Sequence, residues 1–100
     1  MSSYIKDLMD KLRPKQKAVL IALYYCCTVE RDGKRFLAIG KHIPPEAVQS
    51  KLKPQFRKKV KTALDFLCAK GLARRSPTRG GVTYYLTREG FQVAELLLLE

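Results

Sequence analysis

The chain has 100 residues, 46% of them hydrophobic, and a formal net charge of +11. This length is typical of one domain with one core, and the composition allows folding without a metal or disulfides. No stretch approaches the roughly 20 consecutive apolar residues of a membrane span. The start, residues 1–7, lacks the apolar segment of a secretory signal. We therefore expect a soluble, cytoplasmic protein without a membrane partner.

The basic residues are concentrated in one part of the chain. Between Glu46 and Glu89 the only acid is Asp65. The same window contains the basic residues Lys51, Lys53, Arg57, Lys58, Lys59, Lys61, Lys70, Arg74, Arg75, Arg79 and Arg88. A surface that served only solubility would mix acids and bases evenly, so this segregation favours a polyanionic partner.

Two helices are predicted in the first third of the chain. Apolar residues recur at helical spacing over 4–12, and Pro14 suits the first turn of a second helix. From Ala18 to Cys27 this second helix is apolar on almost every side, which predicts that it forms the buried centre of the domain. A polar turn over 30–34 and one short strand over 35–39 follow.

The cysteines and the single histidine do not indicate a chemical site. The chain has three cysteines, an odd number that argues against a disulfide framework. Cysteine and histidine are common zinc ligands, but the short paired spacing of zinc sites is missing from Cys26, Cys27, Cys68 and His42. Nothing places a third orienting residue beside a Cys–His pair, and burial disfavours a thiol sensor at Cys26 and Cys27. We expect no metal, no cofactor and no enzymatic activity.

The middle of the chain predicts a short helix, a turn and a long helix. Pro45 opens the short helix, and residues 50–53 break the pattern. The long helix spans 54–70. Its apolar residues follow a helical period at Phe56, Val60, Ala63, Leu64 and Leu67. Gly71 stands where a left-handed C-terminal cap belongs.

A change of period after Gly71 predicts a hairpin over 72–86. Its strands cover 72–76 and 82–86, and the turn between them is rich in glycine and proline and carries Arg79. Thr87 then caps a last helix over 88–99. Because no linker or repeat interrupts the chain, we expect a single α+β domain over 1–100.

Three segments, in this order, resemble the winged helix-turn-helix family, in particular small prokaryotic and archaeal regulators of the broad MarR/PadR type. Leu12 to Leu20 resembles the opening helix, in which Leu-x-x-x-Gln precedes an apolar pair. Ala63 to Arg75 resembles the end of the recognition helix, with Lys-Gly-Leu before a basic pair. Tyr84 to Gly90 resembles the close of the wing, Tyr-x-Leu-Thr-x-x-Gly. The resemblance covers about residues 12–99 and implies a mainly helical winged-helix fold with a two- or three-stranded β-wing.

The resemblance also implies double-stranded DNA binding, as a sequence-specific transcriptional regulator. An α-helix fits the major groove, so Gln55 and Lys58 near the start of the recognition helix are candidates to contact bases. The other candidate DNA-binding residues are Lys51, Arg57, Lys59 and Lys61 for phosphates, Lys53 in the preceding turn, Thr62 for either purpose, Arg79 at the wing tip, and Arg74 and Arg75. Because Arg74 and Arg75 alternate in direction on a strand, we expect only one of them to face DNA.

The two ends of the chain predict a homodimer. Apolar residues over 4–12 and the run Leu96 to Leu99 exceed what one small core absorbs, and consecutive leucines point in every direction around a helix. By analogy with the family, these terminal helices would pair across a two-fold axis and place two recognition helices about one DNA turn apart. The alternative is that the first helix covers the leucines within one chain.

Two other functions remain open at this point. One is a winged-helix module that binds another protein within a larger assembly. The other is non-specific binding of DNA or RNA, in which aromatic stacking is expected. Tyr84 and Tyr85 are the aromatic residues near the basic hairpin, and their strand positions place one of them in the core.

Overall fold

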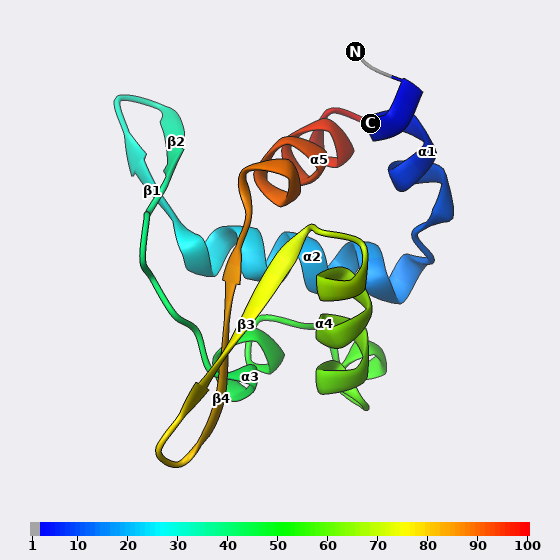
Figure 1. Ribbon diagram of the computed structural model, residues 1–100. Coiled ribbons are helices and arrows are strands. Elements are labelled where there is room, and N and C mark those ends of the chain that lie inside the picture. The colour runs from blue at the N-terminus through cyan, green and yellow to red at the C-terminus, as the bar shows by residue number, and fades with distance from the viewer. Residues whose placement is uncertain (1–2) are drawn as a thin grey trace.

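The computed structural model describes residues 3–100 and is an α+β fold (Figure 1). Its helices are α1 (Ser3–Lys11), α2 (Pro14–Cys27), α3 (Pro45–Gln49), α4 (Val60–Ala69) and α5 (Arg88–Leu99), with a 3-10 turn, η1 (Pro54–Phe56), before α4. The strands form two antiparallel pairs, β1 (Thr28–Arg31) with β2 (Lys34–Leu37), and β3 (Ala73–Thr78) with β4 (Gly81–Leu86). No helix within residues 3–100 is long and apolar enough to cross a membrane.

Helix α2 is the centre of the domain, as its sequence predicts. It passes through the middle of the molecule and contacts α3, α4, α5 and β4 (Figure 1). Val19, Leu20 and Leu23 are completely buried. A helix that is apolar on nearly all sides requires partners on all sides, and this topology supplies them.

The first and last helices lie where the periodicity predicts them, and they pack on each other. Thr87 caps α5 as expected, because its Oγ1 accepts a hydrogen bond from the Gly90 amide at 3.0 Å. Gly90 itself is required by packing. A Cβ there would lie 1.9 Å from the Leu72 carbonyl oxygen, closer than any real contact allows. The Thr-x-x-Gly sequence therefore joins α5 to the base of the wing.

The wing hairpin is longer than predicted. Strands β3 and β4 pair from Ala73–Leu86 out to Thr78–Gly81, so the turn is shorter than the predicted turn over 77–81. Pro77 is tolerated inside β3 because β3 is an edge strand, where a missing amide N–H breaks no ladder. On the other side of β4, Ile43 forms an isolated β-bridge with Tyr84, so the sheet itself has two strands.

The segment after α2 differs from the prediction of one strand over 35–39. Residues 28–31, of which Glu30 and Arg31 belong to the predicted turn, form β1 and pair with β2 from Thr28–Leu37 to Arg31–Lys34. Asp32 and Gly33 connect the strands with φ of 53° and 79°. Positive φ at both central residues is the geometry of a type I′ turn, which Asp-Gly sequences favour because it matches the twist of a hairpin.

The prediction of one long helix over 54–70 is wrong for its first third, residues 54–59. Pro54–Phe56 form only the 3-10 turn, Lys59 has a φ of 55°, and α4 begins at Val60. A helix begun at Pro54 would hold Arg57, Lys58 and Lys59 in its first turns, where the helix dipole disfavours cations. Phe56 kept the helical period in the sequence because it is half-buried against the core from the 3-10 turn.

Candidate nucleic-acid interface

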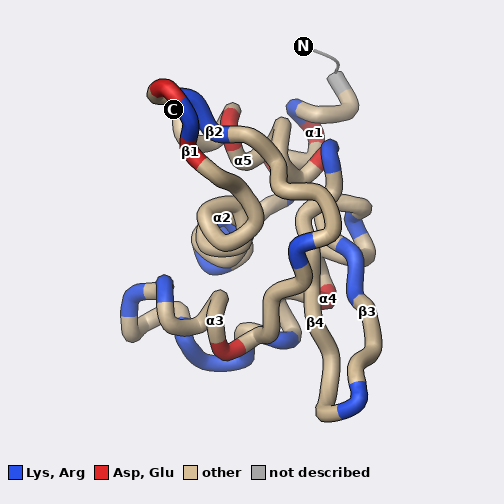
Figure 2. The backbone as a smooth tube through the Cα atoms, turned by 90° about the vertical axis from the view of Figure 1, so that its left-hand side faces the viewer, with Lys and Arg blue, Asp and Glu red and all other residues tan. Residues whose placement is uncertain are grey.

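The structure brings most of the predicted DNA-binding residues to one end of the molecule. Every one of them is exposed. Six of them lie in the segment between α3 and α4, namely Lys51, Lys53, Gln55, Arg57, Lys58 and Lys59. Helix α4 carries Lys61 and Thr62, strand β3 carries Arg74 and Arg75, and the turn between β3 and β4 carries Arg79. Figure 2 shows basic stretches around α3 and at the wing tip, at the end of the molecule opposite β1 and β2. We call residues 51–59 the basic loop.

The basic loop is held by hydrogen bonds and by an apolar anchor. Arg57 Nε donates to the Leu52 carbonyl at 2.9 Å, and the Gln49 side chain donates to the Arg57 carbonyl at 3.0 Å. Lys15 Nζ, from the start of α2, donates to the Lys58 carbonyl. Leu52 is buried beneath the loop. The loop is therefore a fixed platform that presents its lysines to solvent, rather than a flexible tether.

Helix α4 has a clear inner and outer side. Val60, Ala63, Leu64 and Leu67 are buried, whereas Lys61 and Thr62 are exposed. Asp65, half-buried, is one turn further along the outer side. The outer side that would meet a ligand is thus short and carries one cation, one hydroxyl and one acid.

Asp65 joins α4 to both strands of the wing. Its Oδ1 accepts a hydrogen bond from the Tyr84 hydroxyl at 2.7 Å. The same oxygen lies 3.4 Å from Arg75 Nη1, and Asp65 and Arg75 form the only ion pair within residues 3–100. Burial, and then the hydrogen bond to Asp65, raise the pKa of Tyr84 to about 12. The tyrosine therefore remains a neutral donor, and the junction sets the angle between α4 and the hairpin.

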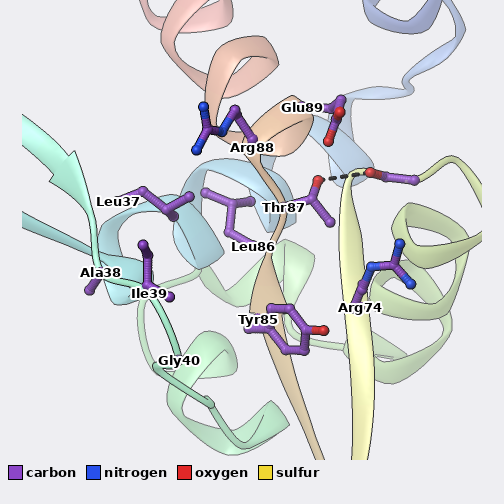
Figure 3. A pocket seen from close by; sticks show the side chains of 11 residues that line it. Leu37, Ala38, Ile39, Gly40, Arg74, Tyr85, Leu86, Thr87, Arg88 and Glu89 are labelled. Carbon is purple, nitrogen blue, oxygen red and sulfur yellow. Dashed lines mark hydrogen bonds between the residues drawn. The ribbon is translucent and has the colours of Figure 1, made fainter.

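The two faces of the wing differ, as the alternation of Arg74 and Arg75 predicts. Arg75 lies on the Tyr84 face, toward α4, and Arg74 lies on the opposite face with Tyr85. There the ring of Tyr85 meets that of His42 edge-on, with centroids 5.0 Å apart. Figure 3 shows Arg74 and Tyr85 beside a shallow depression that Leu37 and Ile39 also line. Arg74 is therefore separated from the basic loop by the sheet.

Two expectations about base contacts need correction. Gln55 and Lys58 do not stand at the N-terminal end of a recognition helix, because both precede α4 in the basic loop. Lys61 and Thr62 occupy that helical position instead. Sequence reasoning also missed Asp65, Tyr84 and Lys15 as parts of the site, although Asp65 was visible as the one acid of the basic window.

The cysteines and acidic residues form no second centre. Within residues 3–100, no group of three or more His, Cys, Asp or Glu side chains is placed to hold a metal ion. Cys26 and Cys27 are buried, Cys68 is half-buried, and all three are free thiols. Burial raises the pKa of each thiol above its usual value, which keeps these groups protonated and unreactive.

Comparison of the chain with family models, with curated proteins and with solved structures found no match.

Proposed function

We propose that this protein is a winged-helix protein that binds double-stranded DNA and regulates transcription in a sequence-specific manner. The observation that carries the proposal is the exposed, nearly acid-free cluster of cations on the basic loop, α4 and the wing turn. Binding that neutralises several phosphates releases counterions, so a surface of this kind gains affinity from the backbone of any duplex.

Helix α4 is the element that fits the major groove. An α-helix with its side chains is about 10–12 Å across, which matches the roughly 12 Å width of the groove, so α4 can bring one of its turns to the base edges. Lys61 and Thr62 are the side chains that this turn presents. The lysines of the basic loop then lie against phosphates on one side of the groove, and Arg79 in the wing turn reaches the neighbouring backbone or minor groove.

Arg74 and Arg75 provide a matched pair that tests this orientation. We expect Arg75→Ala to weaken duplex binding by about threefold to tenfold and to reduce the salt slope by about one, as for the loss of one phosphate contact. Arg74→Ala removes the same charge from the opposite face and should change affinity much less. Fluorescence anisotropy with a labelled duplex at several salt concentrations measures both. Equal losses would contradict the proposed orientation.

Sequence specificity is tested by selection from random duplexes followed by sequencing. The proposal predicts a recurring motif, and Thr62→Ala or Lys61→Ala should relax preference at particular positions. Lys58→Ala should weaken binding about uniformly across sequences, because a phosphate contact carries no sequence information. Salt-sensitive binding without a motif would reduce the proposal to non-specific nucleic-acid binding. An absence of binding at low salt would refute it.

We further propose that the protein acts as a homodimer through α1 and α5. The first helix covers part of the leucine run within its own chain, since Leu8, Met9 and Leu97 are buried. Leu98 and Leu99 remain 42% and 81% exposed, as does Tyr4 at 59%. Sedimentation equilibrium should find a dimer that L98Q together with L99Q dissociates. A wild-type monomer at high concentration would exclude this interface.

A further inference from the structure

The hairpin formed by β1 and β2 projects from the end of α2, away from the basic loop and the wing turn (Figures 1 and 2). Thr28 at its base is buried, and Arg35 holds it there. Arg35 Nε donates to Thr28 Oγ1 at 2.8 Å, and its guanidinium lies 4.8 Å from the centroid of the Tyr25 ring. The hairpin is therefore a fixed feature of the surface that the proposed DNA contacts do not use.

Its outer face combines an apolar pair with two cations. Val29 and Phe36 are direct cross-strand partners and are 45% and 50% exposed. Arg31 and Lys34 are the next pair on the same face, because side chains two residues apart on a strand point to the same side. Both cations are exposed. We call these four residues the outer hairpin face.

Charge on this hairpin is segregated by face. Glu30 alternates to the opposite side and pairs in register with Arg35, and Asp32 lies in the turn. The outer hairpin face thus keeps two cations without an acid opposite them. A second copy of this chain would set those cations against the same cations, which is unfavourable for neighbouring strands. The face is complementary to a partner that carries carboxylates.

The strands also offer backbone groups. Within residues 3–100, β1 and β2 form a sheet only with each other, so neither has a second strand beside it. An extended peptide that adds to the edge of such a sheet gains main-chain hydrogen bonds and places alternate side chains on one face. Neither a nucleic-acid duplex nor a lipid surface supplies a strand of this kind, and a duplex has no apolar side chain for Val29 and Phe36.

We propose that the β1–β2 hairpin docks an extended, acidic segment of another protein. Apolar side chains of that segment cover Val29 and Phe36, and its carboxylates face Arg31 and Lys34. The proposal is independent of DNA binding, because the hairpin and the basic loop lie at opposite ends of the molecule. A protein bound to DNA through the basic loop would still present this face to a partner.

The test uses a synthetic peptide with the repeat Val-Thr-Glu-Thr, which places valine and glutamate alternately on one side of a strand. Titration into the isotope-labelled full chain, followed by amide NMR, should shift residues 28–37 and leave residues 51–62 unchanged. A peptide with the repeat Val-Thr-Lys-Thr should bind more weakly by about tenfold or more, as expected when like charges meet. Equal binding of the two peptides, or no shift in 28–37, would overturn the proposal.

A charge swap makes the test specific. The double variant with R31E and K34E should no longer bind the glutamate peptide and should bind the lysine peptide instead. The control variant with K6E and K11E on α1 should bind both peptides as the wild type does. Such rescue cannot arise from an unfolded hairpin. Oligodeoxythymidine and vesicles of anionic phospholipid are titrated in parallel. A stronger response of residues 28–37 to either of these than to the glutamate peptide would contradict the assignment of a protein partner.

Discussion

The two hairpins of this protein, with strands of four residues in β1–β2 and of six in β3–β4, differ in how they contact the core. In the wing, Tyr84, Ala73 and Leu86 are buried, and Asp65 ties the strands to α4. In the β1–β2 hairpin, only Thr28 is buried, and the cross-strand pair Val29–Phe36 lies open to solvent. The β3–β4 hairpin therefore contributes side chains to the core, whereas the β1–β2 hairpin packs on the rest of the domain at its base alone.

Because of this difference, we expect substitutions in the two hairpins to affect the stability of the fold to different extents. Substitutions in the wing should disturb folding and the proposed DNA binding together, since Tyr84 is in the core and its hydroxyl joins the hairpin to Asp65 of α4. Substitutions on the outer hairpin face should change recognition with little effect on folding.

The largest expected contrast is between Tyr84→Ala and Phe36→Ala. Loss of the buried ring should lower the free energy of unfolding by about 3 to 5 kcal/mol, because a cavity remains in a packed core. Loss of the exposed ring should change it by about 0.5 kcal/mol or less. Urea denaturation of both variants measures the difference. A similar destabilisation by the two substitutions would show that the hairpins are not anchored differently.

Alkaline pH should destabilise the fold through two buried tyrosines. One is Tyr84 at the junction with Asp65, and the other is Tyr24 of α2, whose hydroxyl donates to Glu95 Oε2 on α5 at 3.1 Å. Burial and a carboxylate partner, Glu95 for Tyr24 and Asp65 for Tyr84, raise each pKa from 10.0 to about 12. The unfolded chain then loses these protons first, so the contribution of the two tyrosines to the free energy of unfolding is fully present below pH 10 and is lost as pH rises toward 12. Each phenol contributes up to about 3 kcal/mol of this loss.

Denaturation at a series of pH values, with Tyr24→Phe and Tyr84→Phe as comparisons, checks this expectation. Each substitution should remove its own share of the alkaline loss, because phenylalanine has no proton to release. A wild-type profile that stays flat between pH 10 and 12 would contradict the raised pKa values.

Gly90→Ala tests the joint between α5 and the wing. The added Cβ would collide with the Leu72 backbone, which cannot move aside as a flexible side chain can. We expect a loss of about 1 to 3 kcal/mol, the usual cost of overpacking. Thermal unfolding provides the measurement, and Gly80→Ala in the open wing turn is the matched control, since nothing lies within 4 Å of its Cβ. Indistinguishable melting temperatures would argue against the close packing of Gly90 on Leu72.

Gly33→Ala should have a smaller effect than Gly90→Ala, and one that is confined to the β1–β2 hairpin. Gly33 has a φ of 79°, where a side chain costs about 1 to 2 kcal/mol, although nothing lies within 4 Å of the added carbon. Hydrogen exchange should quicken in residues 28–37 and remain unchanged in the wing. Faster exchange in the wing as well would show that the two hairpins open together.

Much of the fold could be predicted from the sequence because the relevant signals are local. Pro14 and Thr87 mark helix starts, and uniform apolarity marks α2. The start of α4 could not be predicted, since Phe56 keeps the helical period while it contacts the core from a 3-10 turn. Strand β1 was hidden by its polar residues Glu30 and Arg31, although the Asp-Gly dipeptide that follows is a hairpin signal.

The candidate site was predictable in its charge but not in its geometry. Lysines in an acid-poor window are exposed whatever the fold, because burying unpaired cations is costly. The pairing of Asp65 with Tyr84 and Arg75 depends on how α4 packs against the hairpin, and no local pattern encodes it. For the same reason, periodicity alone could not show that Lys61 and Thr62 replace Gln55 and Lys58 at the start of the helix.

The most direct test of DNA binding through the basic end is an NMR titration of the full chain with a short DNA duplex at low salt. We predict shifts of the amides in 51–62 and around Arg75 and Arg79, a loss of these shifts as salt rises, and no change in residues 28–37. No shift at low salt, or shifts confined to the β1–β2 hairpin, would contradict it.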